Sequence, residues 1–289
     1  MTKVFLNFVV CIALTLPGTV SAAPDAERRV ALVIGNSDYE HVASLPNPAN
    51  DAEDISNALK RLGFEVTSGL DLDYRDMRLA LRDFSEAAAE ADVAVVYFAG
   101  HGIEIDNTNF LIPVNAELRS DRDVDFEAIR LDTVIGSLED AKGLRIVLLD
   151  ACRNNPFLVD MQRTTASRSI GRGLGRVDPG GVLVSYAARG GTIALDGEGR
   201  NSPYAKALLG TLETPGLEIG KLFRQVRDLV LEDTGGFQEP FTYGSLPGTD
   251  IFLKAPEPKK TAAASPVPLS VPPAPDDALI TDFAKAERR

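Results

Sequence analysis

Apolar segments typical of β-strands alternate with segments of helical spacing from about residue 28 to residue 254 of this chain. The strand-like segments are rich in Val, Ile and Leu and lack the apolar–polar alternation of a half-exposed sheet; they span 29–35, 64–69, 92–100, 144–151 and 181–188. A continuous apolar strand must be covered on both faces. The alternation therefore predicts an α/β fold in which a mostly parallel sheet carries helices on both faces.

Five helices are expected between or after these strands. In the first, Ala52, Ile55 and Leu59 recur on one face, with Asn50 as the predicted cap and Glu53 three positions later. The predicted helices span Asp51–Leu62, 73–91, Leu131–Asp140, Pro203–Leu212 and Leu217–Glu232.

The first 22 residues have the features of a signal peptide. Lys3 is followed by an apolar run and then by small residues in "TVSAAPDA", so we expect cleavage after Ala22. The mature chain is then predicted to be secreted or periplasmic, with no membrane insertion. Cleavage removes Cys11 and leaves Cys152 as the only cysteine.

Residues 23–254 are predicted to form the folded domain, and residues 255–289, rich in Pro and Ala, a disordered tail. The formal net charge of −12 and a pI of about 4.7 argue against nucleic-acid binding, which requires a basic surface. We expect a monomer.

Two of the strand-like segments end at residues that carry chemistry. His101 follows one in "YFAGHG" and Cys152 follows another in "LLDACRN". Because functional groups in open α/β sheets gather beyond the carboxyl ends of the strands, the two side chains are expected at one edge. A thiol beside an imidazole is the pairing that cysteine hydrolases use. Taken alone, each residue also has a purely structural interpretation. Cys152 is then a small buried hydrophobic residue, and His101 is a hydrogen-bonded loop residue.

The glycines that flank His101 let main-chain amides approach a substrate closely. The amides of Gly102 and Cys152 are therefore predicted to stabilise a developing oxyanion. His41, the only other histidine, has no comparable partner in the sequence and is predicted to lie on the surface.

Several motifs together resemble the caspase-like cysteine peptidases, and most closely their bacterial metacaspase-type, or orthocaspase-like, branch. The motifs are "ALVIGNSDY", "LPNPANDAEDI", "VVYFAGHG", "LLDACRNNPF" and "SYAARGGTIALDGEGRNSPYAKALL". The resemblance implies a caspase-like three-layer sandwich with about six strands, the last one antiparallel. It also implies a dyad of His101 and Cys152 and endopeptidase activity.

Asp150 stands two residues before Cys152, where aspartate-cleaving caspases have glutamine, and Asp51 matches a second acidic position of the metacaspase pocket. Two carboxylates attract a guanidinium, so we expect cleavage after Arg in preference to Lys. Asp51 has the alternative role of complementing a helix dipole. Further substrate-binding residues are expected at Ala99, Ser185 and Tyr186.

The segment from about residue 157 to residue 180 is rich in Arg, Ser and Gly and is predicted to be a loop. Self-cleavage there is a hypothesis, with the alternative that its arginines are only a solvated linker. The candidate cleavage sites are Arg163, Arg168, Arg172 and Arg176.

We predict no cofactor. The run Asp121, Asp123, Asp125 and Glu127 lacks the EF-hand spacing, so calcium activation stays open without a motif to support it. The predicted function is a cysteine endopeptidase acting on peptides or proteins with basic residues at the cleavage site, with self-processing as a hypothesis. The alternatives are a catalytically weak scaffold that binds basic peptides or a protein partner, and a hydrolase of small esters or amides.

Overall fold

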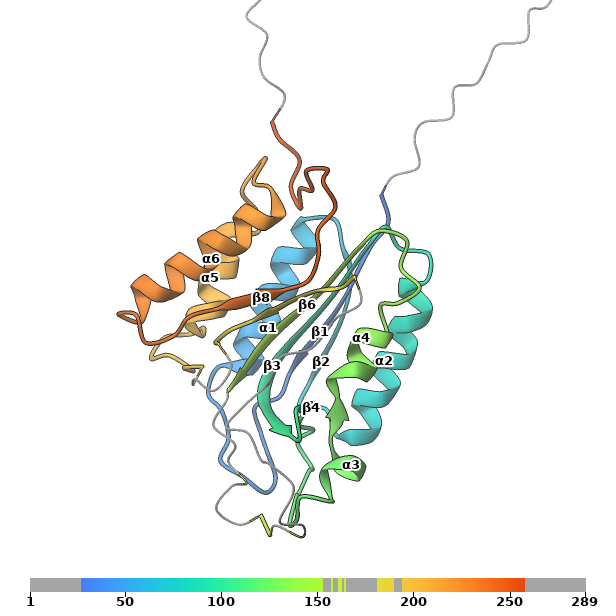
Figure 1. The fold of residues 1–289 in the computed structure, drawn as a ribbon, viewed down its shortest axis with the longest axis vertical. Coiled ribbons are helices and arrows are strands. Elements are labelled where there is room, and N and C mark those ends of the chain that lie inside the picture. The colour runs from blue at the N-terminus through green and yellow to red at the C-terminus, as the bar shows by residue number, and fades with distance from the viewer. Residues whose placement is uncertain are drawn as a thin grey trace, which may run out of the picture. The chain divides into compact units, whose positions relative to one another are not determined.

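A computed structural model describes residues 27–152, 157, 161, 162, 164, 181–189 and 194–257, with only the backbone at Cys152 (Figure 1). Its main sheet has six strands in the order β2-β1-β3-β6-β7-β8. The first five are parallel and β8 is antiparallel to β7. The strands are β1 (Arg29–Gly35), β2 (Glu65–Leu70), β3 (Val93–Ile105), β6 (Leu144–Cys152), β7 (Leu183–Tyr186) and β8 (Phe241–Tyr243). The predicted mostly parallel sheet is confirmed.

Helices cover both faces of the sheet, as the apolar strands require (Figure 1). On one face Ile55, Leu208 and Phe223 pack in a single apolar cluster with the sheet; on the other Met77 and Val134 do so. The first layer holds α1 (Pro48–Arg61), α5 (Pro203–Thr211) and α6 (Ile219–Asp233), and the second α2 (Tyr74–Ala88) and α4 (Leu131–Gly136). This is the predicted three-layer sandwich.

Several helix boundaries differ from the sequence prediction, and two of the differences have a clear local reason. Asn50 was expected to cap α1, but the helix begins at Pro48 with Asn47 in the cap position. Proline suits a first helical position because its ring presets φ and its missing N–H would be unpaired there anyway. At the other boundary α4 ends at Gly136, before the predicted Asp140, and the Ser137 hydroxyl donates to the Val134 carbonyl there (2.7 Å).

Strand β3 is longer than predicted and changes partner along its length. It pairs with β6 as far as His101, and from Gly102 onwards it pairs with β4 (Thr108–Leu111). His101 was expected just beyond the strand and instead lies within it, because pairing with β4 extends β3 past its last pair with β6. The short elements β5 (Ile129–Arg130) and α3 (Val124–Glu127) complete this extension.

Several predictions concern residues outside the described part of the chain. These are the signal peptide of residues 1–22, the four arginines of the 157–180 loop, and the tail beyond residue 257. Within the described residues, no helix has both the length and the apolar character needed to cross a bilayer.

Candidate active site

The middle of β3 and the carboxyl end of β6 bring the backbones of His101 and Cys152 together. The two strands are parallel neighbours, and His101 and Cys152 are the last residue pair in their register. Residues 51 positions apart in sequence thus meet at one point on the sheet edge. This adjacency follows from the strand order, in which no other strand lies between β3 and β6.

The imidazole of His101 is buried, with 4% of the residue exposed. Its Nε2 lies 3.4 Å from the Ala43 carbonyl oxygen, and its Nδ1 has no hydrogen-bond partner among the described residues. Burial lowers the pKa of His101 to about 4, and the Ala43 carbonyl opposes this only in part. At neutral pH the ring is therefore uncharged, and a proton on Nε2 that is donated to Ala43 leaves the lone pair on Nδ1.

The Gly102 amide faces the edge of β3 on which Cys152 lies. The Ile112 amide donates to the His101 carbonyl (3.0 Å), so at His101 the polar groups of the backbone face β4. Backbone groups point to alternate edges along a strand, which turns the Gly102 N–H towards β6. An amide in this position is suited to stabilising an oxyanion formed near the backbone of Cys152.

Two buried carboxylates lie beside this strand end. Asp150 on β6 is 7% exposed and Asp51 in the first turn of α1 is 1% exposed. Ser202, the N-cap residue of α5, contacts both: its hydroxyl donates to Asp150 and its amide donates to Asp51 (3.1 Å). The Tyr97 hydroxyl also donates to Asp150 (3.1 Å). Residues from a strand and two helices thus form one acidic cluster.

The acidic cluster has a third member, Asp196, which the sequence analysis did not single out. Its charge raises the pKa of both Asp51 and Asp150, and burial raises its own pKa to about 6. Burial is also the main reason that the pKa values of Asp51 and Asp150 lie above the ordinary carboxyl range. The cluster therefore retains protons that separate aspartates would lose, and a cation placed among them would release those protons.

Arg200 holds the chain near Asp196 against the outer side of α1. Its guanidinium binds Glu53 (2.7 Å) and Asp54 (2.8 Å), and so its charge is directed to these two residues. The Asn47 side chain in addition donates to the Asp196 carbonyl. Sequence could predict Ser202 as a helix cap from the Ser-Pro pair, but these long-range contacts have no local sequence signal.

The other predicted substrate-binding residues lie at different places. Ala99 is directly opposite Asp150 in the β3–β6 register. Ser185 is buried and accepts a hydrogen bond from the Tyr204 hydroxyl (2.8 Å). Tyr186 packs in the apolar layer on the opposite face, with α2 and α4, and the fold does not bring it to the acidic cluster.

The carboxylates of the acidic run at residues 121–127 accept hydrogen bonds from nearby backbone amides and from a neighbouring loop. Glu127 accepts from the Glu117 amide (2.8 Å), Asp123 from the Ser120 amide (2.6 Å), and Asp121 from the Thr164 amide (3.0 Å). No group of three or more His, Cys, Asp or Glu side chains in the described part of the chain is arranged to hold a metal. His41, predicted on the surface, has a side chain 40% exposed.

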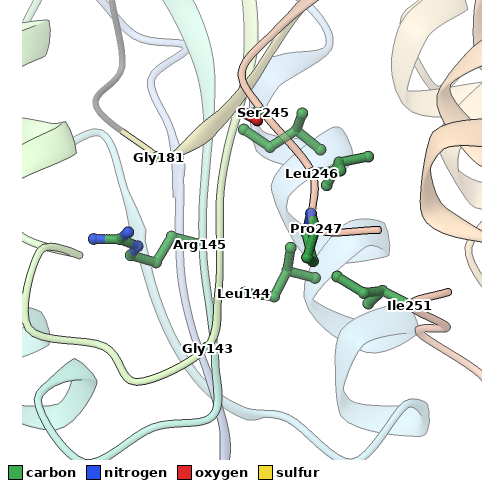
Figure 2. A pocket seen from close by; sticks show the side chains of 9 residues that line it. Gly143, Leu144, Arg145, Gly181, Ser245, Leu246, Pro247 and Ile251 are labelled. Atoms are coloured by element: carbon green, nitrogen blue, oxygen red, sulfur yellow. The ribbon is translucent and has the colours of Figure 1, made fainter. Parts of the chain in front are cut away.

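A hollow of about 230 Å³ lies at the opposite end of the sheet, where β6 and β7 begin (Figure 2). Leu144, Leu246, Pro247 and Ile251 line it, while the guanidinium of Arg145 extends away from them (Figure 2). The amino ends of the strands face this hollow, so it is separate from the carboxyl-end site of His101 and the acidic cluster.

Comparisons with known proteins agree with this fold. The sequence profile described as "Caspase domain" matches residues 28–249. Over 133 residues, or 45% of the chain, the sequence is 33% identical to the human mucosa-associated lymphoid tissue lymphoma translocation protein 1 and 32% identical to its mouse homolog. These alignments span only 16% and 15% of the two relatives. The crystal structure of caspase-1 from Spodoptera frugiperda matches with a TM-score of 0.54 at 16% identity, covering 80% of this chain and 91% of that one.

Proposed function

Because this chain belongs to the caspase-domain family of cysteine peptidases, we propose that it is an endopeptidase that cleaves after arginine, and less readily after lysine. The observation that carries the proposal is the acidic cluster, which lies beside the paired backbones of His101 and Cys152. In this proposal Cys152 is the nucleophile, His101 is the general base and acid, and Asp51, Asp150 and Asp196 bind the substrate side chain.

The reaction begins when Nδ1 of His101 accepts the proton of the Cys152 thiol, and the sulfur attacks the substrate carbonyl. The Ala43 carbonyl holds Nε2–H, which keeps the lone pair on Nδ1. The amides of Gly102 and Cys152 stabilise the oxyanion. The imidazolium then protonates the leaving amine as the C–N bond breaks, and a water molecule hydrolyses the thioester and returns the thiol.

Selection of arginine follows from the geometry of the acidic cluster. A guanidinium has five N–H donors in a plane and bonds several carboxylates at once, whereas an ammonium is a compact point charge. An acidic substrate side chain would add a further negative charge to the three aspartates, at a cost of several kcal/mol. The repulsion that adds to the effect of burial on the pKa values of Asp51 and Asp150 therefore also disfavours aspartate substrates.

The decisive experiment compares fluorogenic peptides that differ only in ending with Arg, Lys, citrulline or Asp, with calcium and with a chelator. We expect kcat/KM for the Arg peptide to exceed that for the Asp peptide by at least about 100-fold, because like charges in a desolvated pocket cost several kcal/mol. The Lys peptide should fall between them. The Cys152→Ala variant serves as the zero-activity control.

Equal turnover of Arg and citrulline peptides would contradict the role of the acidic cluster, because citrulline keeps the shape and removes the charge. Absence of turnover for every peptide, with and without calcium, would favour the binding scaffold. Faster turnover of small amides than of extended peptides would favour the small-amide hydrolase.

Binding of arginine is expected to release protons from the acidic cluster. The free cluster has raised carboxyl pKa values, and a bound guanidinium lowers them again. Affinity should therefore rise with pH across the interval between the ordinary carboxyl pKa of about 4 and the raised values. Calorimetry of an Arg peptide on Cys152→Ala near pH 6, in two buffers of different ionisation enthalpy, measures the protons released.

The matched citrulline peptide should bind more weakly and release no protons. If the Arg peptide bound with the same affinity at about pH 5 and pH 8 and released no protons, its side chain would not enter this acidic cluster.

A further inference from the structure

The loop of residues 36–45, which follows β1, encloses His101 on two sides. Tyr39, 6% exposed, places its ring centroid 4.4 Å from that of the imidazole at an angle of 49°. The Ala43 carbonyl lies against Nε2 on another side. An aromatic ring at this distance is in van der Waals contact with the imidazole and excludes water from the covered face. The orientation of His101 thus depends on a loop distant in sequence.

The Tyr39 hydroxyl is inserted into the ladder between β3 and β4. His101 and Ile112 are opposed residues, and the Ile112 amide donates to the His101 carbonyl (3.0 Å). In a regular antiparallel pair the His101 amide would donate to Ile112 in return. Here the His101 amide donates to the Tyr39 hydroxyl (2.7 Å), which lies 3.4 Å from the Ile112 carbonyl as its donor.

Gly100 provides the space for this insertion. A Cβ at residue 100 would lie 2.6 Å from the Tyr39 oxygen, closer than real side chains allow. The glycine before His101 therefore admits a side chain from the 36–45 loop at the point where pairing of β3 with β6 ends and pairing with β4 begins.

The 36–45 loop is itself held by the surrounding backbone. The Asn36 amide donates to the Ala99 carbonyl (2.9 Å), and its side chain donates to the Ile112 carbonyl (3.1 Å) and accepts from the Leu72 amide (3.0 Å). The Ser37 amide donates to Asp71 (2.7 Å). On the other side of Tyr39, the Glu40 amide donates to the Val114 carbonyl (2.9 Å). Because the chain is anchored before and after Tyr39, this residue approaches His101 from a fixed position.

We propose that Tyr39 is a positioning residue for His101: its ring holds the plane of the imidazole, and its hydroxyl holds the His101 backbone where the pairing of β3 with β6 ends. Nε2 then stays on Ala43 and Nδ1 stays available for proton transfer. The proposal rests on the role of His101 in the proposed function, but the orientation of the ring is measurable without any activity.

Two substitutions separate the roles of the ring and the hydroxyl. Tyr39→Phe keeps the ring and removes the inserted hydroxyl, and we expect kcat for the Arg peptide to fall about 10-fold with KM little changed, since sub-ångström misplacement of a catalytic group slows chemistry. Tyr39→Leu removes the aromatic cover and opens the imidazole to water. The pKa of His101 should then rise from about 4 towards the ordinary value of about 6.5.

The chain contains only two histidines, which makes the imidazole signals simple to follow by NMR. His41 is exposed and serves as an internal reference in every spectrum. We expect ¹⁵N spectra of the wild-type full chain to show that His101 stays neutral, with its proton on Nε2, down to about pH 4. In Tyr39→Leu the His101 signal should titrate at least one pH unit higher, and in Tyr39→Phe it should shift towards a mixture of tautomers.

Tyr74→Phe is the matched control, because Tyr74 is a tyrosine at the start of α2 whose hydroxyl accepts only a surface hydrogen bond from Arg78 (3.2 Å). It should change neither kcat nor the His101 signal. An unchanged His101 titration in Tyr39→Leu together with an unchanged tautomer in Tyr39→Phe would overturn the proposal. If the wild-type chain cleaves no peptide while the spectra change as expected, the proposed function fails and the positioning role of Tyr39 stands.

Discussion

Replacing His101 by alanine is expected to lower kcat/KM for an arginine peptide by about 10²–10⁴-fold, the range that a positioned general base contributes. The reason is that a thiol is a poor nucleophile until a base removes its proton, and the buried Nδ1 beside the end of β6 is the atom available for this transfer. The loss should appear in kcat rather than KM, because the proton moves only after the substrate has bound. Initial rates over a range of peptide concentrations separate the two.

His41→Ala is the matched control for this experiment. It removes the other histidine of the chain, which is exposed and belongs to the loop next to the site, so the rate should stay within about twofold of wild type, as for a typical surface substitution. Cys152→Ala should abolish turnover because no nucleophile is left. If His101→Ala retained wild-type kcat, or if His41→Ala lost as much activity, the assignment of His101 as the base would be wrong.

Replacing Asp150 by asparagine should have the largest effect on specificity. The amide keeps the shape and can still accept from Tyr97 and Ser202, but it removes one charge that a guanidinium would meet. Loss of one member of a buried charge pair costs about 2–5 kcal/mol, which corresponds to roughly 30-fold to 4,000-fold in kcat/KM for the Arg peptide. The citrulline peptide should be affected far less. Parallel loss for both peptides would indicate damage to the fold instead.

Asp51→Asn should raise the stability of the folded chain at neutral pH, in contrast to the loss of activity expected for Asp150→Asn. The raised pKa of Asp51 means that the folded chain binds a proton more tightly than the unfolded chain. The unfolded carboxyl loses its proton first as the pH rises above about 4, so stability falls until the pH passes the raised folded value. Asparagine removes this penalty. Thermal melting should show a higher Tm for the variant at neutral pH and little difference near pH 4.

One pKa unit corresponds to about 1.4 kcal/mol, so the gain in the free energy of unfolding should be at least on that order at neutral pH. Asp54→Asn is the matched control on the same helix. The hydrogen bond from Arg200, rather than burial, has the largest effect on the Asp54 carboxyl and holds its pKa below the usual range. Asparagine at this position should therefore lower stability slightly and leave arginine selectivity unchanged. A destabilised Asp51→Asn at neutral pH would contradict the account of the acidic cluster.

The layered fold could be predicted because its causes are local in the sequence. Continuous Val, Ile and Leu segments are typical of strands that are covered on both faces. The helical segments between them form the crossover connections that pack on the sheet and lead to the next parallel strand. Residues at the ends of β3 and β6 were therefore predictable as site residues before their neighbourhood was known. The prediction placed the end of β3 too early because pairing with β4 depends on a hairpin partner, not on the apolar run itself.

The acidic cluster was predictable only in part. Asp150 and Asp51 could be named from motifs, but Asp196 and the double contact of Ser202 arise where α5 meets β6 and α1. Tyr186, in contrast, was predicted to bind substrate and does not lie at the acidic cluster. It follows Ser185 by one residue, and successive side chains of a strand point to opposite faces of the sheet. A shift of one residue along a strand changes the face of the sheet to which a side chain points, and neither composition nor a motif predicts that face.

The sequence by itself determined the class of fold, the edge of the sheet that carries chemistry, and the residue types available there, because periodicity and strand ends are properties of neighbouring residues. Only the tertiary structure decided that β3 lies next to β6, that Ser202 joins the two aspartates, and that Tyr39 and Ala43 enclose His101. These contacts join residues far apart in the chain. Their physical basis is burial, which excludes water, removes the screening between carboxylates and lowers the pKa of the histidine, and burial exists only once the layers have packed.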